Sequence, residues 1–301
     1  MRRPAPILLL VLVPFVAPVR AQNADVAAMV KQGQTLLGEG NLDAALEQFR
    51  AAVSADPQRY DAQDGLGRAL DLAGQYQEAR QHLQRAIALA PDDEKNQALA
   101  TMAVSLAFDG PAEDAARYYR RAFDAQTAAK DPAAAAATAN AMARVYLESG
   151  ILDKAEQWYR TGYETSKRLS HRPASQARLW ELRWQHALGR IAARRHRRGA
   201  ALQHASAVKR LLDQGGNENQ RAAYPYLLGY IDYHTRHYRE AVAALKRGDQ
   251  NDVFVLGLIA QSYRKLGDRA HAREYFERVL ASTAHNLPSA FMRPAAREYQ
   301  K

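Results

Sequence analysis

The chain has 301 residues, no cysteine and a formal net charge of +10 at pH 7. Without cysteine there is no disulfide, no thiol nucleophile and no zinc–thiolate site, so stability must come from packing alone. The charge is uneven, because residues 22–159 carry 13 Lys and Arg against 20 Asp and Glu, whereas residues 160–301 carry 26 against 12. The length allows a large core in one or two domains.

The N-terminus is typical of a secretory signal peptide. Arg2 and Arg3 form a short positive region, residues 7–16 are almost all apolar, and Val19 and Ala21 are small residues at the positions that a signal peptidase inspects. The apolar run is shorter than the roughly 20 residues that span a bilayer. We therefore expect a signal peptide over residues 1–21, cleaved after Ala21, and a soluble periplasmic or secreted protein. An uncleaved N-terminal anchor is the alternative.

A repeat of 34 residues organises the chain that follows. Pro57 and Pro91 are 34 residues apart, and GNLDAALEQFRAAVSADP reappears as GQYQEARQHLQRAIALAP. Such a period indicates helix–turn–helix units that stack into a solenoid. Gly40 and Gly74 stand where the first helix of a unit must end, since glycine accepts the left-handed backbone conformation needed there. The predicted units lie near residues 26–59, 60–93, 96–129, 136–169, 174–214, 222–250 and 253–284.

These units resemble the tetratricopeptide repeat. Its pattern has small residues where the two helices of a unit cross, such as Ala45 and Gly67, and a large residue beside them, such as Phe49. The fifth unit is irregular, because Ala205 replaces the aromatic residue. The resemblance implies an all-α, right-handed α-solenoid of about seven units over residues 22–285. We expect residues 286–301 to form a short C-terminal segment that caps the last apolar face.

The resemblance also implies a binding surface, because the first helices of such units line a concave groove that commonly binds an extended peptide or a partner helix. In the late units Tyr226, Tyr230 and Tyr233 share one helix face, and tyrosine and arginine are common anchors of binding sites. Packing between repeats is the alternative for these tyrosines. The predicted late groove, for an acidic or aromatic segment, comprises Arg190, Tyr226, Tyr230, Tyr233, Gln261 and Arg264. The same register adds Gln34, Asp64, Arg68, Asp71, Asn140 and His186.

The densest run of charge is RIAARRHRRG, at residues 190–199. A helix dipole favours cations at the helix C-terminus, so a solvated helix end is one interpretation. The other is a patch for a polyanion, either an anionic glycan or an anionic lipid surface. We expect no nucleic-acid partner, because the chain is predicted to be exported and has no aromatic strand platform beside the run. The residues of the predicted patch are Arg194, Arg195, Arg197 and Arg198.

Sequence patterns for catalysis are missing, since the chain has no H-E-x-x-H, no G-x-S-x-G and no phosphate-binding G-x4-G-K-[ST]. Asp232, His234, His237 and Glu240 could share a metal ion at one turn, but solvated turn residues are the simpler interpretation. We predict no catalytic residue, no metal and no cofactor. The predicted function is a non-catalytic scaffold or adaptor of the bacterial cell envelope that binds another protein. The alternatives are a polyanion-binding module and an assembly factor of an envelope or secretion complex.

Overall fold

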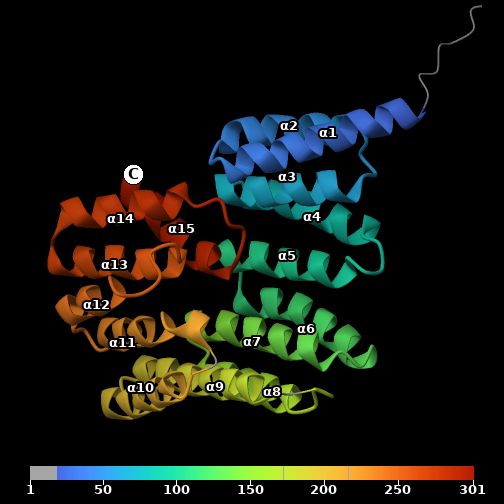
Figure 1. Ribbon diagram of the computed structural model, residues 1–301. Coiled ribbons are helices and arrows are strands. Elements are labelled where there is room, and N and C mark those ends of the chain that lie inside the picture. Colours follow the sequence, from blue (N-terminus) through green and yellow to red (C-terminus); the bar gives the residue numbers. More distant parts are fainter. Residues whose placement is uncertain (1–18, 172, 216) are drawn as a thin grey trace, which may run out of the picture.

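The computed structural model describes residues 19–301 except 172 and 216, with side chains described from residue 25 onward. These residues form 15 α-helices and one 3₁₀ turn, Glu218–Gln220, and they contain no strand (Figure 1). The predicted all-α solenoid is confirmed. Most of the predicted signal peptide, residues 1–18, lies outside the described residues. No helix within the described ranges is both long and apolar enough to cross a membrane.

Fourteen of the described helices pack as successive pairs that stack upon one another (Figure 1). Each pair lies close to one of the units predicted from the 34-residue period. In chain order the pairs are α1 (Val19–Gly38) with α2 (Leu42–Ala55), α3 (Tyr60–Ala73) with α4 (Tyr76–Leu89), α5 (Lys95–Asp109) with α6 (Ala112–Ala128), α7 (Pro132–Glu148) with α8 (Leu152–Ser166), α9 (Ala174–Arg194) with α10 (Arg198–Asp213), α11 (Ala223–His234) with α12 (Tyr238–Leu245), and α13 (Val253–Leu266) with α14 (Arg269–Ala281).

Small residues and left-handed glycines give these pairs their shape. A Cβ atom on Gly67 would lie 2.6 Å from the Leu83 side chain, so only glycine lets α3 and α4 approach this closely. Gly74 ends α3 with φ of +84°, and Gly267 ends α13 with φ of +80°, which are conformations that other residues rarely adopt. The sequence therefore sets both the spacing within a pair and the point at which the chain reverses.

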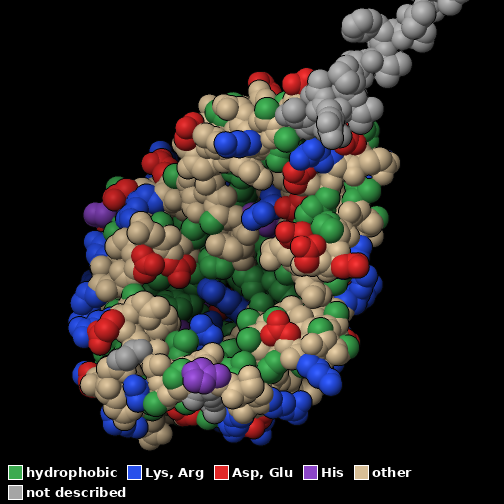
Figure 2. Space-filling model, turned by 45° about the vertical axis from the view of Figure 1, so that its right-hand side comes forward, with side chains coloured by type: hydrophobic (Ala, Val, Ile, Leu, Met, Phe, Trp, Pro, Cys, Tyr) green, Lys and Arg blue, Asp and Glu red, His purple; other side chains and the backbone are tan. Residues whose placement is uncertain are grey.

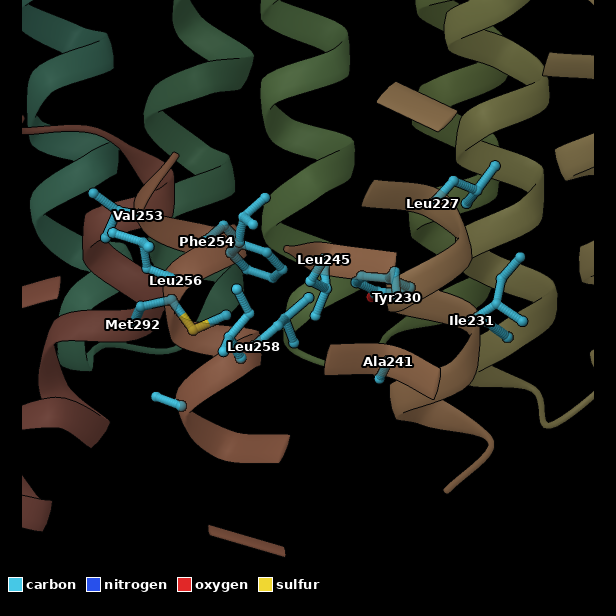
Figure 3. Close-up of a cluster of buried hydrophobic side chains, with 14 of the residues drawn as sticks. Leu227, Tyr230, Ile231, Ala241, Leu245, Val253, Phe254, Leu256, Leu258 and Met292 are labelled. Atoms are coloured by element: carbon cyan, nitrogen blue, oxygen red, sulfur yellow. The ribbon is translucent and has the colours of Figure 1, made fainter. Parts of the chain in front are cut away.

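The largest core cluster joins the last units of the solenoid. Tyr230 of α11, Phe254 and Leu258 of α13, and Met292 of the last helix are all buried and lie close together (Figure 3). The side chain of Tyr230 is completely buried. The late units are thus held together by side chains that converge from four or more helices rather than by pairwise contacts alone.

The last helix, α15 (Leu287–Gln300), closes the solenoid on itself. It packs against α13 and α14, where the sequence predicted a cap, and also against α5 and α7 (Figure 1). Nη2 of Arg293 donates a hydrogen bond of 2.8 Å to the Leu72 carbonyl oxygen at the end of α3, and Arg297 donates to the same oxygen. The C-terminal segment therefore bridges the seventh unit to the second and third. It also separates two hollows on the surface that the first helices of the units line.

Candidate functional site

The first hollow, called here the early depression, lies on the inner side of α1, α3 and α5. Its volume is about 490 Å³. Asp61, Asp64 and Glu94 line it together with Arg68, and Nη1 of Arg68 lies 3.3 Å from Oδ2 of Asp64. Asp61 is also paired, because Nε of Arg59 lies 2.7 Å from its Oδ1, so Glu94 is the lining carboxylate that has no ion pair to a described residue. Its apolar part comes from Leu37, Phe49 and Tyr60.

The second hollow, called here the central cavity, lies between α5, α6, α7, α8, α9, α11 and the start of α15. Its volume is about 590 Å³. Figure 2 shows a hollow on this face with hydrophobic walls and Lys or Arg side chains in its depth. The arginines that line the central cavity are Arg144, Arg183 and Arg190, and its lining contains no Asp or Glu. The C-terminal segment separates the two hollows, because residues 285–288 line the central cavity while Thr283 lines the early depression.

Glu148 is the carboxylate nearest to this arginine cluster, and it is almost fully buried beside the cavity. Its Oε1 lies 3.9 Å from Nη1 of Arg190, and its Oε2 lies 3.5 Å from Nη1 of Arg194 and accepts a 3.2 Å hydrogen bond from the Tyr230 hydroxyl. Burial raises the pKa of Glu148, and the charges of Arg190, Arg144 and Arg194 act in the opposite direction. One carboxylate thus faces several guanidinium groups, which leaves the region positive.

Arg190 is held rigidly at the wall of the cavity. Its Nη2 donates a 2.8 Å hydrogen bond to the Tyr159 hydroxyl, and its guanidinium lies 5.4 Å from the centre of the Tyr159 ring. Burial, and then the charges of Arg190 and Arg144, hold the pKa of His186 well below its ordinary value. His186 is therefore neutral, and the positive charge of the wall comes from the arginines.

Several buried polar atoms around the cavity have no hydrogen-bond partner within the described part of the chain. They include Nε and Nη2 of Arg144, Nε of Arg190, Nε2 of His186 and the hydroxyl of Tyr226. Buried polar groups in folded proteins nearly always have partners, so a group of such atoms around one cavity needs an explanation.

The residues predicted for the late groove are divided by the fold. Arg190 and Tyr226 line the central cavity, whereas Tyr230 is in the core. Tyr233 donates a 2.6 Å hydrogen bond from its hydroxyl to Oε1 of Gln261, and Nε2 of Gln261 contacts the Met292 sulfur at 3.4 Å. These contacts join α11, α13 and α15, which is the packing alternative that the sequence left open. Arg264 is exposed near the end of α13.

Five of the six residues predicted by register line the two hollows, whereas Asp71 is buried and pairs with His285, and some site residues were missed. Gln34, Asp64 and Arg68 line the early depression, and Asn140 and His186 line the central cavity. Arg144 and Arg183 were not predicted. A signal for Arg144 was present, because it follows Asn140 by one helical turn and so shares its face.

Two segments of the chain match family models described as "Tetratricopeptide repeat", over residues 30–94 and 255–286. The chain therefore contains tetratricopeptide repeats. A tetratricopeptide repeat protein from Parabacteroides merdae ATCC 43184 is similar over 92% of this chain and 97% of its own, with 13% identity and a TM-score of 0.52. The apo form of RapI is similar over 87% of this chain and 75% of its own, with 14% identity and a TM-score of 0.58. At these identities the likeness shows the fold alone. No protein with a curated description matches the chain.

The arginine corner of this tetratricopeptide solenoid, Arg194, Arg195, Arg197 and Arg198, is largely paired within the chain. Arg194 lies beside Glu148, as described above, and Nη2 of Arg198 lies 2.8 Å from Oδ1 of Asp232. Arg195 bridges two carboxylates: its Nη2 lies 2.6 Å from Asp153 and its Nη1 lies 2.9 Å from Glu156. Only Arg197 is exposed without an ion pair to a described residue.

The residues considered for a metal ion point to different partners. Asp232 pairs with Arg198, the His234 ring lies 4.3 Å from the Tyr230 ring, and Nδ1 of His237 lies 3.1 Å from the Thr235 hydroxyl. Nowhere in the described ranges do three or more His, Asp or Glu side chains gather as a metal site would require.

Proposed function

We propose that this tetratricopeptide repeat protein is a non-catalytic adaptor of the bacterial cell envelope, which binds a segment of another protein in the early depression. The observation that carries the proposal is that α1, α3 and α5, the first helices of three successive units, present one continuous hollow of about 490 Å³. Oδ1 of Asp64 is buried there without a hydrogen-bond partner among the described residues. An incoming donor would satisfy that oxygen.

The lining of the early depression indicates the chemistry of the segment. Glu94 has no ion pair to a described residue and Oδ1 of Asp64 has no hydrogen-bond partner among them, so a segment with Lys or Arg is favoured over an acidic one. Leu37 and Tyr60 add apolar surface for a neighbouring aliphatic or aromatic side chain. Recognition then combines one or two charged anchors with apolar contacts, as is usual at interfaces.

The envelope location is supported by the N-terminal sequence, with its two arginines, its short apolar run and the small residue Ala21. Fractionation of cells that express the full chain, followed by N-terminal sequencing, tests it. A mature protein that begins at Gln22 in the periplasmic fraction supports export, and a full-length protein retained in the cytoplasm contradicts it. An assembly factor of an envelope complex is the alternative within the same class, and the identity of the partner separates the two.

A site-specific photocrosslinker at Gln97, which lines the early depression, tests the binding site. The crosslinked segment is identified by mass spectrometry, and the affinity of the matching synthetic peptide is then measured. The double variant Asp64→Asn/Glu94→Gln should bind this peptide about tenfold more weakly, because it removes two charges of the depression.

Glu47→Gln/Asp124→Asn is the matched control. It changes the net charge equally, but on exposed positions of the second helices α2 and α6. The control should bind the peptide as tightly as the parent chain. Equal affinity of all three proteins for the peptide, or the absence of any protein crosslinked at Gln97, would overturn the proposed site.

A further inference from the structure

We propose that the central cavity is a binding site for a small organic acid, a carboxylate attached to an apolar or aromatic body. The site is separate from the early depression and goes beyond the adaptor role. The cavity of about 590 Å³ falls within the 300–1,000 Å³ range of small-molecule sites, whereas a water molecule needs about 30 Å³. The space therefore suits a molecule of drug or metabolite size.

The charge of the lining selects an anion. Three arginines reach the cavity and no Asp or Glu lines it. The nearest carboxylate, Glu148, already lies against Arg190 and Arg194 and accepts a hydrogen bond from Tyr230. Arg144 has no ion pair to a described residue, and its guanidinium lies 4.8 Å from the centre of the Phe254 ring. A cationic ligand would be repelled here, and a neutral one would leave the guanidinium charge uncompensated.

The unpartnered atoms favour a carboxylate in particular. Nε and Nη2 of Arg144 share one edge of the guanidinium plane, and both are buried without a partner among the described residues. That edge is the one that binds a carboxylate through two parallel hydrogen bonds. The Tyr226 hydroxyl, which belongs to the same lining, can donate to a remaining lone pair, and Nε2 of His186 can bind a second polar group of the ligand.

The rest of the lining suits an apolar body. Val104, Leu182 and Leu287 reach the cavity, and so do the aromatic rings of Tyr119 and Tyr159. Two of the polar groups are held in place by burial: Arg190, which donates to the Tyr159 hydroxyl, is only 7% exposed, and His186 is 8% exposed. Buried cationic donors that are already held in place beside an apolar surface recognise an anion at low entropic cost.

Calorimetric titration of the full chain with 3-phenylpropionate, and with its neutral amide 3-phenylpropanamide, tests the inference. The two probes have the same shape, and only the acid carries a charge. We expect the acid to bind at least tenfold more tightly than the amide, and to raise the melting temperature by mass action. Equal affinity for both probes, or no binding of the acid at about 10 mM, would overturn the inference.

Two arginine variants and one control locate the site. Arg144→Met keeps an unbranched apolar stem and should weaken acid binding at least tenfold, and Arg183→Met should weaken it less. If Arg144→Met does not fold, the inference is still tested by acid binding to Arg183→Met and by the comparison of the acid with the amide. Arg120→Met is the control, because Arg120 also lies over an aromatic ring, 4.2 Å from that of Trp158, but is exposed outside the cavity. Acid binding that survives both cavity variants contradicts the site.

A peptide could carry the same carboxylate, so a third probe, N-acetyl-Ala-Ala-Phe, separates the two sources. Tighter binding of the free acid supports a small-molecule site. If only the peptide binds, and Arg144→Met abolishes that binding, the small-molecule assignment is overturned and the cavity is a peptide-binding site. Because Asp64→Asn/Glu94→Gln should not alter acid binding, failure of this inference and failure of the adaptor proposal are distinguishable.

Discussion

Asp71 and His285 meet inside the molecule although 214 residues separate them. Nε2 of His285 lies 2.8 Å from Oδ2 of Asp71, and the two side chains are 2% and 0% exposed. The other oxygen of Asp71 accepts a 3.0 Å hydrogen bond from the Ser105 hydroxyl. This polar cluster ties the segment before α15 to α3 and α5, and with Arg293 and Arg297 it holds the solenoid closed.

The first prediction concerns this closure. His285→Ala leaves the Asp71 carboxylate buried with one remaining hydrogen bond, so we expect the free energy of unfolding to fall by about 3 kcal/mol. Hydrogen exchange in α15 should accelerate more than exchange in α7. His271→Ala is the control, because His271 pairs with Asp268 at a distance of 2.7 Å on the exposed surface, where such a pair contributes little to stability. Equal losses in the two variants would show that the buried pair does not hold the closure.

The local parts of this fold were predictable from sequence. The 34-residue period, Gly74 at a helix end and small residues such as Gly67 depend on neighbours within one unit, so the sequence locates them. The closure was not predictable, because it joins residues hundreds of positions apart. The same limit affected the site: Tyr230 has the type and spacing of a groove residue, and only the packing of α13 against α11 decides that it is buried.

The second prediction concerns the close approach of α11 and α12. A Cβ atom on Gly229 would lie 2.7 Å from Cδ2 of Leu245 and 3.2 Å from the Ala241 carbonyl oxygen. We expect Gly229→Ala to lower the free energy of unfolding by about 1–3 kcal/mol, because the core must shift to admit the methyl group. Gly199→Ala in α10 meets nothing within 4 Å and should be neutral or slightly stabilising. Urea unfolding of the two variants measures the contrast, and a neutral Gly229→Ala would mean that this helix pair is not tightly packed.

The third prediction concerns pH. Burial, and then the charges of Arg194 and His196, lower the pKa of His234 to about 3. A histidine in the unfolded chain has a pKa of about 6.5. Below that pH this histidine is protonated in the unfolded state but not in the folded state. The contribution of His234 to the free energy of unfolding is therefore fully present above pH 6.5. It is lost as the pH falls, and the free energy of unfolding should drop by about 1–2 kcal/mol between pH 7 and pH 5.

Urea midpoints at pH 7 and pH 5 measure this effect. His234→Phe keeps an aromatic ring beside Tyr230 and removes the titration, so its midpoint should fall less on acidification than that of the parent chain. The difference between parent and variant is the quantity of interest, because burial also lowers the pKa values of His82, His186 and His204. His171→Gln, at an exposed position, should follow the parent chain. A His234→Phe midpoint that falls as steeply as the parent's would contradict the prediction.

The fourth prediction concerns the arginine corner. Arg195 and Arg198 lie within 3 Å of carboxylates of this chain, at Asp153, Glu156 and Asp232, so their charge is largely compensated before a polyanion arrives. A ligand would have to break these pairs, and the exposed charge that remains is screened within about 10 Å at 0.1 M salt.

We therefore expect the salt concentration that elutes the protein from heparin to fall in Arg197→Ala and to stay unchanged in Arg198→Gln/Asp232→Asn, which removes one compensated ion pair and leaves the net charge as it was. Arg194 is left unchanged in this test, because its loss would remove a partner of the buried Glu148 carboxylate and confuse binding with stability. A fall in Arg198→Gln/Asp232→Asn as large as that in Arg197→Ala, with the helix content intact, would mean that polyanions displace the internal carboxylates. The corner would then be a binding surface for anionic glycans or lipids after all.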